Sequence, residues 1–311
     1  ERMDTSDEWI RERTGIKERR WIKEGSKLST SLMGTYAAKD ALSDANMNKD
    51  DIDFIVFATI SPDYYFPGSG VLLQRNLKIK EIGALDVRNQ CSGFLYALSV
   101  ADQYIKSGMY KNILVVGSEV HSGGLDKSPR GRGVSVIFGD GAGAVILQAN
   151  KTSSSGILST HLHSEGAYAE ELVVISPSTI HWVDKIIDDE KEDGSSYSPY
   201  MNGNFVFKNA VIRFMEVILE ALAANKLSKE DISLLIPHQA NLRISQFVQK
   251  QLGLADEKVY NNIMYYGNTT AASIPIALAE AIEKGKVNKG DVICLAAFGS
   301  GFTWASALIR W

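Results

Sequence analysis

The sequence is poor in cysteine, with only Cys91 and Cys294 in 311 residues. Because neither belongs to a CxxC pair, the sequence offers no disulfide framework and no structural zinc site. It also lacks an uninterrupted apolar run of about 18 residues, which a membrane span would need, and no signal-peptide pattern opens it. We therefore expect a protein of the reducing cytoplasm that makes no contact with a membrane.

A surplus of positive charge is absent as well. The formal net charge of −4 argues against a broad electrostatic attraction to nucleic acid, although a local basic patch remains compatible with it. With 45% hydrophobic residues, the chain can bury a large core. Its length suits one large domain or two of roughly 150 residues each.

The most informative stretch is 82–108. A β-prone run over 82–87 is followed by Cys91, and the apolar residues then follow a mostly helical spacing until Gly108. Cys91 is therefore predicted at a strand-to-helix junction. Unpaired amides and the positive end of the helix dipole would stabilise a thiolate there, which indicates a nucleophile. The alternative is a small buried hydrophobe, the role that we expect for Cys294 in its apolar strand.

The rest of the chain alternates between helical and strand patterns, which is typical of an α/β protein. A capping-box pattern from Thr5 to Glu8 predicts a helix from about Ser6, with Trp9 and Arg13 on one face. The patterns also predict helices over 29–45 and 69–77, strands over 52–59, 82–87 and 112–118, and two strands flanking 139–143.

Two features could suggest a cofactor or a metal. The glycine-rich stretch 139–143 could bind a dinucleotide, but a strand is predicted at 144–148, where that motif needs a helix. We interpret it as a tight turn and expect no nicotinamide cofactor. His161 and His163 share a strand face, but no third ligand is near them in the sequence. A structural role is therefore favoured over a metal site.

The second half of the sequence repeats the first. Residues 41–56 match 221–236 at a constant offset of 180 positions, which indicates an internal duplication. Residues 1–155 and 156–311 are therefore expected to form equivalent halves about a pseudo-two-fold axis. The strand expected at 156–163 should then have a partner before residue 1, so we expect the first strand of the first half to be missing.

The repeat also brings three polar residues together. Counted back from matching glycines at the helix ends, Asn268 falls at the junction that Cys91 occupies in the first half. His238 follows a strand through Pro237, at the carboxyl end where open α/β sheets usually place their sites. We expect the cysteine, the histidine and the asparagine to converge.

Several motifs along the whole chain occur together in one known family. They are Asp4–Ile10, Thr14–Ile16, Cys91–Phe94, Phe138–Gly143, Pro237–Arg243, Gly267–Thr269 and Phe298–Trp304. Together they closely resemble the β-ketoacyl-acyl-carrier-protein synthase III family of condensing enzymes. The resemblance implies an α/β, thiolase-like fold, in which two duplicated halves form a five-layered αβαβα core, and it implies a homodimer.

The resemblance also implies roles for the converging residues. Cys91 would take an acyl group from acyl-coenzyme A as a thioester. Malonyl-acyl carrier protein would then lose carbon dioxide, and His238 with Asn268 would stabilise the resulting enolate oxygen. The backbone N–H groups of Cys91 and Ser300 would form a second oxyanion hole for the condensation.

Binding residues follow from the resemblance in the same way. Those implied for coenzyme A are Thr5, Trp9, Arg13, one of Arg130 and Arg132, Gly203, Phe207 and Asn241. Phe66 would reach across the dimer interface and close the partner's acyl pocket. Lys208, Arg243 and Lys250 would form a basic patch that docks the acidic carrier protein, although each could equally be a solvated surface charge.

We therefore expect an initiating condensing enzyme of type II fatty acid synthesis that uses a short acyl-coenzyme A primer and needs no cofactor or metal. Arg88-Asn89-Gln90 and a long segment at 165–200 depart from the family pattern, and the charged run 188–193 in that segment is expected to be a surface excursion. Two alternatives remain open. One is a related acyltransferase or condensing enzyme of secondary metabolism with a non-acetyl starter, and the other is a non-catalytic acyl-coenzyme A-binding paralogue.

Overall fold

The protein is described by a computed structural model over residues 3–150, 155–180 and 194–311. The charged run at 188–193 lies outside the described residues. The helices are α1 (Asp7–Thr14), α2 (Thr30–Asp44), α3 (Ser69–Leu77), α4 (Gly93–Lys106), α6 (Gly203–Ala224), α7 (Leu242–Leu252), α8 (Ile263–Tyr266) and α9 (Ser273–Glu283). The strands are β1 (Phe54–Ala58), β2 (Gly83–Val87), β3 (Asn112–Glu119), β4 (Gly141–Gln148), β5 (Gly156–Ser164), β6 (Leu172–Val173), β7 (Tyr200–Met201), β8 (Leu234–Pro237), β9 (Val292–Gly299) and β10 (Thr303–Arg310).

Two four-stranded sheets form the framework of the molecule. The first has the order β2–β1–β3–β4, in which β4 alone is antiparallel to its neighbour. The second has the order β5–β10–β9–β8, in which β8 and β9 are parallel and β10 is antiparallel to both of its neighbours. The chain leaves β2 toward Cys91 and leaves β8 toward His238, so both residues follow the carboxyl end of a parallel strand.

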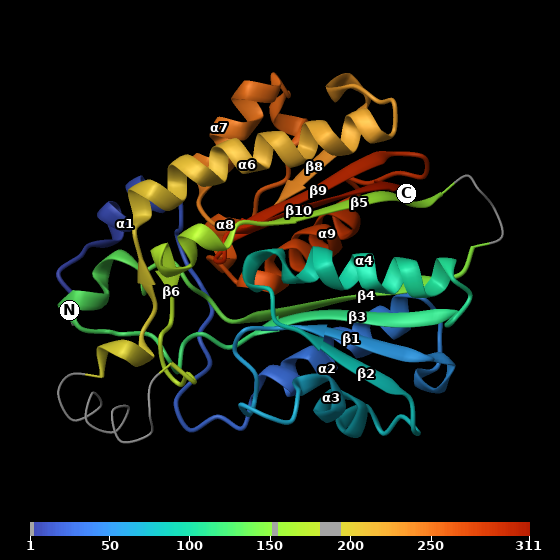
Figure 1. Cartoon of the computed structure of the whole chain (residues 1–311), viewed down its shortest axis with the longest axis horizontal. Coiled ribbons are helices and arrows are strands. Elements are labelled where there is room, and N and C mark those ends of the chain that lie inside the picture. The colour runs from blue at the N-terminus through green and yellow to red at the C-terminus, as the bar shows by residue number, and fades with distance from the viewer. Residues whose placement is uncertain (1–2, 151–154, 181–193) are drawn as a thin grey trace.

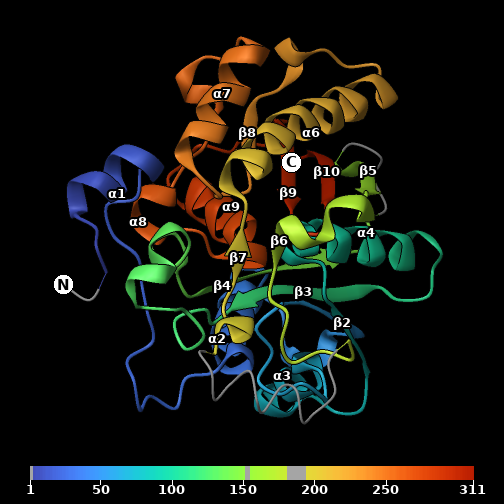
Figure 2. The ribbon, with the colours of Figure 1, turned by 60° about the vertical axis from the view of Figure 1, so that its left-hand side comes forward.

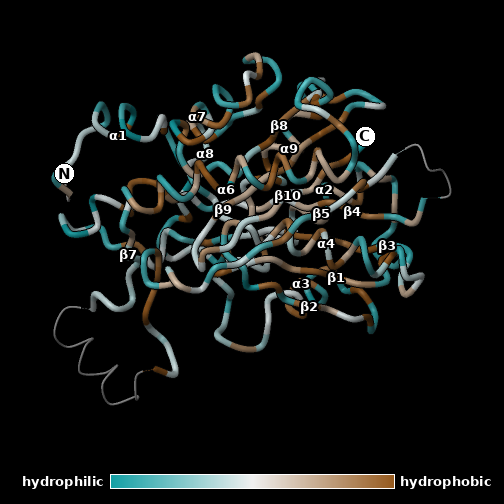
Figure 3. The backbone as a smooth tube through the Cα atoms, turned by 45° about the horizontal axis from the view of Figure 1, so that its top comes forward, coloured by the Kyte–Doolittle hydropathy of each residue, from teal (hydrophilic) through white to brown (hydrophobic). Residues whose placement is uncertain are grey.

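Helices and sheets stack as five layers (Figure 1). α2 and α3 pack on the outer face of the first sheet, α4 and α9 fill the space between the sheets, and α6 and α7 pack on the outer face of the second sheet. Figure 3 shows hydrophobic segments along β1 and β8 and hydrophilic ones in α1. The αβαβα layering implied by the resemblance is confirmed.

Central elements are buried on all sides, which explains their apolar sequences. β1 and β9 have both faces covered by helices, so they are continuous apolar runs without a polar alternation. α4 buries Phe94, Leu95 and Leu98 between the two sheets, and burying one such side chain contributes about 1.5–3 kcal/mol. Among the described residues, no helix combines the length and apolar character that crossing a bilayer requires.

The internal repeat is confirmed at the level of secondary structure. β3 and β9 have the same length and keep the offset of 180 residues. Each half also has a 3₁₀ turn ahead of its first parallel strand, at Lys49–Asp51 and at Lys229–Asp231. Both turns are closed by a capping box, so the same local hydrogen bonds start the strand in each copy.

The counterpart of Cys91 differs from the prediction. α4 begins at Gly93 and α9 at Ser273, so the offset of 180 continues through the junction and pairs Cys91 with Ala271 instead of Asn268. α9 has 11 residues against 14 in α4, nearly one turn fewer. Counting back from the glycines at the helix ends therefore misaligned the two junctions by three residues.

Three local predictions are corrected by the structure. Ser6 caps α1 by accepting a hydrogen bond from the backbone N–H of Trp9, in place of the capping box predicted from Thr5. In the described part of the chain no strand directly precedes Gly139, and β4 already begins within the stretch interpreted as a tight turn. A Cβ atom on Gly139 would lie 2.3 Å from the carbonyl oxygen of Tyr266, so this glycine permits close backbone packing.

The outer edge of β4 is open in the described part of the chain. β5 pairs with β10 in the second sheet, but no described strand pairs with the equivalent edge of β4. A strand preceding residue 1, which the repeat leads us to expect, stays a prediction.

A close backbone approach between the halves, at Gly117, gives the first testable prediction. A Cβ atom on Gly117 in β3 would lie 2.4 Å from the carbonyl oxygen of Ala271. Because a backbone oxygen cannot rotate away, Gly117→Ala should lower the free energy of unfolding by about 1–3 kcal/mol. Urea unfolding followed by tryptophan fluorescence measures the change.

Gly93→Ala is the matched control. Its new methyl group would meet its nearest neighbour, the Cβ atom of Ala58, at an ordinary 3.5 Å, and Gly93 already has helical backbone angles. The control should therefore leave stability unchanged or raise it slightly. An equal loss of stability in both variants would contradict the proposed role of the backbone contact.

Candidate active site

Cys91, His238 and Asn268 line one cavity of about 100 Å³. Its other walls are mostly apolar and include Phe207 on α6 and Phe298 on β9. All three polar residues are largely buried. The structure therefore brings together the three residues that we expected to converge.

His238 is held in one orientation by its backbone and its ring. Its backbone N–H donates to Ala296 O at 2.7 Å, and its Nδ1 lies 2.6 Å from Ser273 Oγ. Burial lowers the pKa of His238 to about 3, so the ring is neutral at physiological pH. Ser273 Oγ accepts from the backbone N–H of Gln239, which leaves its own proton for Nδ1. A neutral ring whose Nδ1 accepts carries its proton on Nε2, which has no partner among the described residues.

Asn268 is fixed by three hydrogen bonds. Its backbone N–H donates to Ile137 O, and its backbone carbonyl accepts from Gly139 N–H. Its side-chain Oδ1 accepts from the backbone N–H of Thr270 at 2.9 Å. Because the amide oxygen is occupied, the NH₂ group is the part of the side chain left for a ligand in the cavity.

Cys91 lies in a 3₁₀ turn, η2 (Gln90–Ser92), directly before α4. Burial, followed by the charge of Glu119, raises the pKa of Cys91 to about 12. Burial therefore opposes the thiolate that the helix N-terminus was expected to stabilise, and the nucleophilic role of Cys91 stays a prediction. Gly299 packs so closely that a Cβ atom there would lie 3.2 Å from Cys91 Sγ.

Glu119 is a fully buried carboxylate that the sequence analysis missed. Its oxygens accept hydrogen bonds from the hydroxyls of Thr59 and Ser61 and from the backbone N–H groups of Ile60, Ser61 and Ala271. Burial raises its pKa to about 7, although every one of these donors opposes that shift. The available signal was a lone acidic residue at the carboxyl end of an apolar strand.

A second cavity of about 330 Å³ adjoins the first and has a basic rim. The two cavities share Gly203, Phe207 and Asn241, and the second adds the side chains of Lys208 and Arg243. A path thus leads from the buried triad to positive charge at the surface. Lys250 is exposed in the last turn of α7, whose first turn carries Arg243.

The aromatic and basic residues predicted near the N-terminus form a cluster beside this path. α1 lies against α7 (Figure 2), and the Trp9 ring has the guanidinium carbons of Arg13 and Arg132 at 5.6 and 4.4 Å. Arg130 instead pairs through Nε with Asp126 at 2.6 Å. Thr5 is partly buried, and its hydroxyl has no partner among the described residues.

Other predicted residues lie outside the triad cavity. Phe66 is 81% exposed on the loop before α3, and Ser300 follows β9, where its hydroxyl donates to Leu172 O. Cys294 is buried in β9, and burial raises its pKa to about 12. His161 and His163 both contact Glu220. Within the described residues, no cluster of three or more potential ligands could hold a metal.

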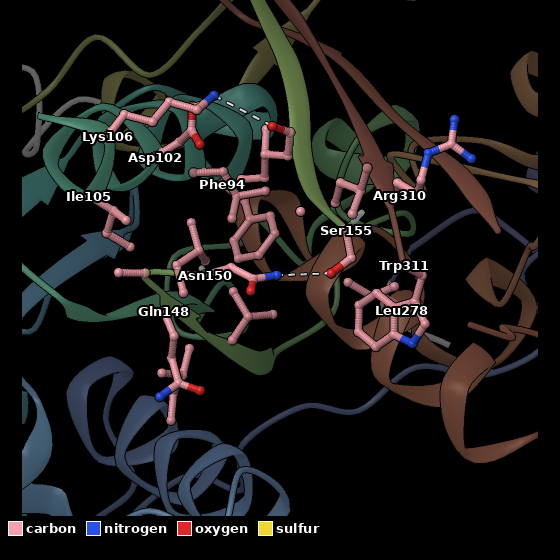
Figure 4. A pocket seen from close by; sticks show the side chains of 18 residues that line it. Phe94, Asp102, Ile105, Lys106, Gln148, Asn150, Ser155, Leu278, Arg310 and Trp311 are labelled. Atoms are coloured by element: carbon pink, nitrogen blue, oxygen red, sulfur yellow. Dashed lines mark hydrogen bonds and ion pairs between the residues drawn. The ribbon is translucent and has the colours of Figure 1, made fainter. Parts of the chain in front are cut away.

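A larger cavity of about 610 Å³ lies elsewhere and contains none of the predicted site residues (Figure 4). It runs along the open edge of β4, and Phe94, Leu278 and Trp311 contribute to its lining. Its polar groups include the ion pair of Lys106 with Asp102 at 2.7 Å. It shares no lining residue with the cavity that contains Cys91.

Comparisons with known proteins agree with this geometry. A family model described as 3-Oxoacyl-[acyl-carrier-protein (ACP)] synthase III matches residues 85–166, and a model of the C-terminal part of the same synthase matches residues 222–311. A curated β-ketoacyl-[acyl-carrier-protein] synthase III of Yersinia pseudotuberculosis is 46% identical over 99% of this chain and 92% of its own length. The Rhodospirillum centenum synthase III is 45% identical with the same coverage.

Solved structures give the same result. The crystal structure of the synthase III from Aquifex aeolicus has a TM-score of 0.89 and 44% identity, and the match covers 100% of this chain and 92% of that one. The Thermus thermophilus enzyme has a TM-score of 0.89 and 38% identity, with 99% and 92% covered. With this identity over nearly the whole length of both chains, the protein belongs to the 3-oxoacyl-acyl-carrier-protein synthase III family of thiolase-like condensing enzymes.

Proposed function

We propose that Cys91, His238 and Asn268 carry out the two half-reactions of an initiating condensing enzyme. As a member of its family the chain is an acyltransferase, and its relatives favour fatty acid synthesis over secondary metabolism. The observation that carries the residue assignment is the shared cavity of the three side chains.

Acyl transfer is the first half-reaction. The Cys91 sulfur attacks the thioester carbonyl of a short acyl-coenzyme A, coenzyme A leaves, and the cysteine proton ends on the departing thiol. The backbone N–H groups of Cys91 and Ser300 are proposed to hold the oxyanion, since β9 and its following turn lie against Cys91. No metal or organic cofactor takes part in this step or the next.

Decarboxylative condensation is the second half-reaction. Malonyl-acyl carrier protein loses its carboxylate as carbon dioxide, and the electron pair left on the α-carbon forms an enolate. His238 Nε2–H and Asn268 Nδ2–H donate to the enolate oxygen. The carbanion then attacks the Cys91 thioester, and the sulfur leaves as a thiolate and takes a proton from the solvent. A neutral imidazole suits this role, because its Nε2–H donates a hydrogen bond to the enolate oxygen and is too weak an acid to protonate the enolate.

This division of roles predicts separable defects. Cys91→Ala should abolish both acylation and condensation. His238→Ala and Asn268→Ala should leave acylation intact and slow condensation on the order of 100- to 1,000-fold, which is typical for the loss of one oxyanion donor. Intact mass after mixing with a panel of acyl-coenzyme A thioesters measures acylation, and release of labelled carbon dioxide from malonyl-acyl carrier protein measures the second step.

Two outcomes would contradict the assignment. Equal loss of acylation in all three variants would refute the division of roles. An absence of any mass gain in the wild type would favour the non-catalytic paralogue. The acyl donor that gives the fastest gain identifies the primer, so a non-acetyl donor would revive the secondary-metabolism alternative.

Substrate binding is proposed to follow the path from the basic surface to the triad. Arg132, with Trp9 and Arg13, would hold the adenine and phosphates of coenzyme A. The Arg132 guanidinium lies 4.4 Å from the Trp9 ring, too close for a stacked base between them. It would have to move, because such a sandwich needs a separation of about 7 Å. Thr5, Gly203, Phe207 and Asn241 would line the pantetheine path, and Lys208, Arg243 and Lys250 would dock the acidic carrier protein.

These surfaces predict that the Michaelis constants for the two substrates rise in different variants. Arg132→Ala should raise KM for acyl-coenzyme A about 10-fold, which corresponds to about 1.4 kcal/mol. Arg243→Ala should raise KM for malonyl-acyl carrier protein and spare KM for acyl-coenzyme A. Arg130→Ala is the control and should change neither, because its guanidinium pairs with Asp126. If Arg130→Ala and Arg132→Ala had equal effects, the assignment of Arg132 would fail.

A homodimer is proposed from the outer edge of the first sheet. β2 is the edge strand, and next to it Tyr64, Tyr65 and Phe66 are 58–81% exposed. An apolar patch beside an open strand edge is a typical association surface. Phe66 of one copy would then lie over the acyl pocket of the other.

The dimer should be sensitive to charge at this edge. Leu85 on β2 is 37% exposed, and Leu85→Lys should place two like charges near each other at the interface and favour monomers. Ile212→Lys on α6, where the side chain is 53% exposed in the opposite outer layer, is the control. Light scattering measures the mass, and a wild type with the mass of one chain would refute the dimer.

A location in the cytoplasm and a division of the chain into two halves are also proposed. The two cysteines are free, as expected for the reducing cytoplasm, and cell fractionation tests this location. The boundary between the halves at residues 155 and 156 is proposed because β5 opens the second sheet. Limited proteolysis near this boundary tests it.

A further inference from the structure

Thr270, two residues after Asn268, has a strained backbone conformation. Its φ of 48° lies in the left-handed region, which a β-branched residue rarely adopts. Such conformations persist only where the surrounding structure imposes them, and they cluster at functional sites. The N–H of Thr270 donates to Asn268 Oδ1 at 2.9 Å, so the orientation of the catalytic amide depends on where this turn holds Thr270.

The side chain of His121 reaches this turn from the other half of the molecule. His121 Nε2 lies 2.8 Å from Thr270 Oγ1. The imidazole packs against Phe138, with the ring centroids 4.9 Å apart. Burial lowers the pKa of His121 to about 4, although the charge of Asp140 opposes the shift, so the ring is neutral at physiological pH.

The backbone of His121 is itself anchored. Its N–H donates to Asp140 Oδ1 at 2.7 Å, and Ser122 donates to the same carboxylate through its N–H and its hydroxyl. Asp140 therefore fixes His121, which contacts Thr270, which in turn contacts Asn268. His121 does not line the triad cavity itself, and it reaches the catalytic residues through this series of contacts and through Phe138, which does line the cavity.

We propose that His121 is a positioning residue for decarboxylation. By holding Thr270 in place through its hydroxyl, His121 keeps the Thr270 N–H on Oδ1 of Asn268 and directs the NH₂ group into the cavity. Without this contact the Asn268 amide can rotate and present its oxygen to the enolate, which would repel the developing negative charge. Acyl transfer to Cys91 does not use the Asn268 amide and is independent of His121.

The inference rests on the proposed roles of Cys91 and Asn268, and its test compares the two half-reactions. His121→Leu should slow decarboxylation of malonyl-acyl carrier protein about 10-fold and leave the rate of Cys91 acylation within about twofold of the wild type. A defect confined to one half-reaction is expected when stabilisation of the enolate oxyanion is weakened. His121→Gln, which retains a polar nitrogen near the position of Nε2, should recover most of the rate. Thr270→Val should reproduce the defect of His121→Leu, whereas Thr270→Ser should not.

The decisive control places His121→Leu in the Asn268→Ala background. If His121 acts through Asn268, the second substitution should have no further effect there. An unchanged decarboxylation rate in His121→Leu, an equal loss of both half-reactions, or full additivity with Asn268→Ala would overturn the inference. None of these results affects the proposed function, which depends on Cys91 acylation and on the Asn268→Ala defect alone.

Discussion

The close packing of two strand-to-helix junctions is the constraint on which the site depends. η2, which carries Cys91, and η8 (Thr270–Ala272), which follows Asn268, lie against each other where the halves meet. β3 approaches η8 so closely that Gly117 has no room for a side chain. Since packed interiors transmit small shifts, the separation of the nucleophile and the oxyanion donors depends on this contact.

Burial has opposite consequences for the two catalytic groups. It keeps His238 neutral, which leaves the ring able to donate a hydrogen bond without protonating an enolate, but it also raises the pKa of Cys91 and so disfavours the thiolate. The charge of Glu119 adds to the second effect, while its carboxylate connects the end of β1 to η8 through hydrogen bonds. The same buried environment thus favours the condensation, which uses neutral His238, and opposes the acyl transfer, because the Cys91 thiol must lose its proton in a poorly solvated cavity.

The two halves share the same backbone at their strand-to-helix junctions, but their residues at the active site differ. Both junctions contain a left-handed residue at the same relative position, Gln90 with φ of 45° and Thr270 with φ of 48°. The next position is Cys91 in one copy and Ala271 in the other, so only one junction retains a nucleophile. The second junction provides donors instead, through Asn268 and through Ser273, which holds the His238 ring.

Local patterns in the sequence were sufficient to predict much of the protein. Periodicity located α3 over 69–77 and β3 from 112, and the constant offset of 180 residues revealed the duplication, because both are properties of neighbouring residues along the chain. The internal repeat and the motifs shared with a known family predicted that His238 and Asn268 converge with Cys91. Only the tertiary structure decided the register of Asn268, the association of Arg132 rather than Arg130 with Trp9, and the contacts of Glu119 and His121. These depend on atoms that come from distant parts of the sequence, and on desolvation, which is a property of the folded interior alone.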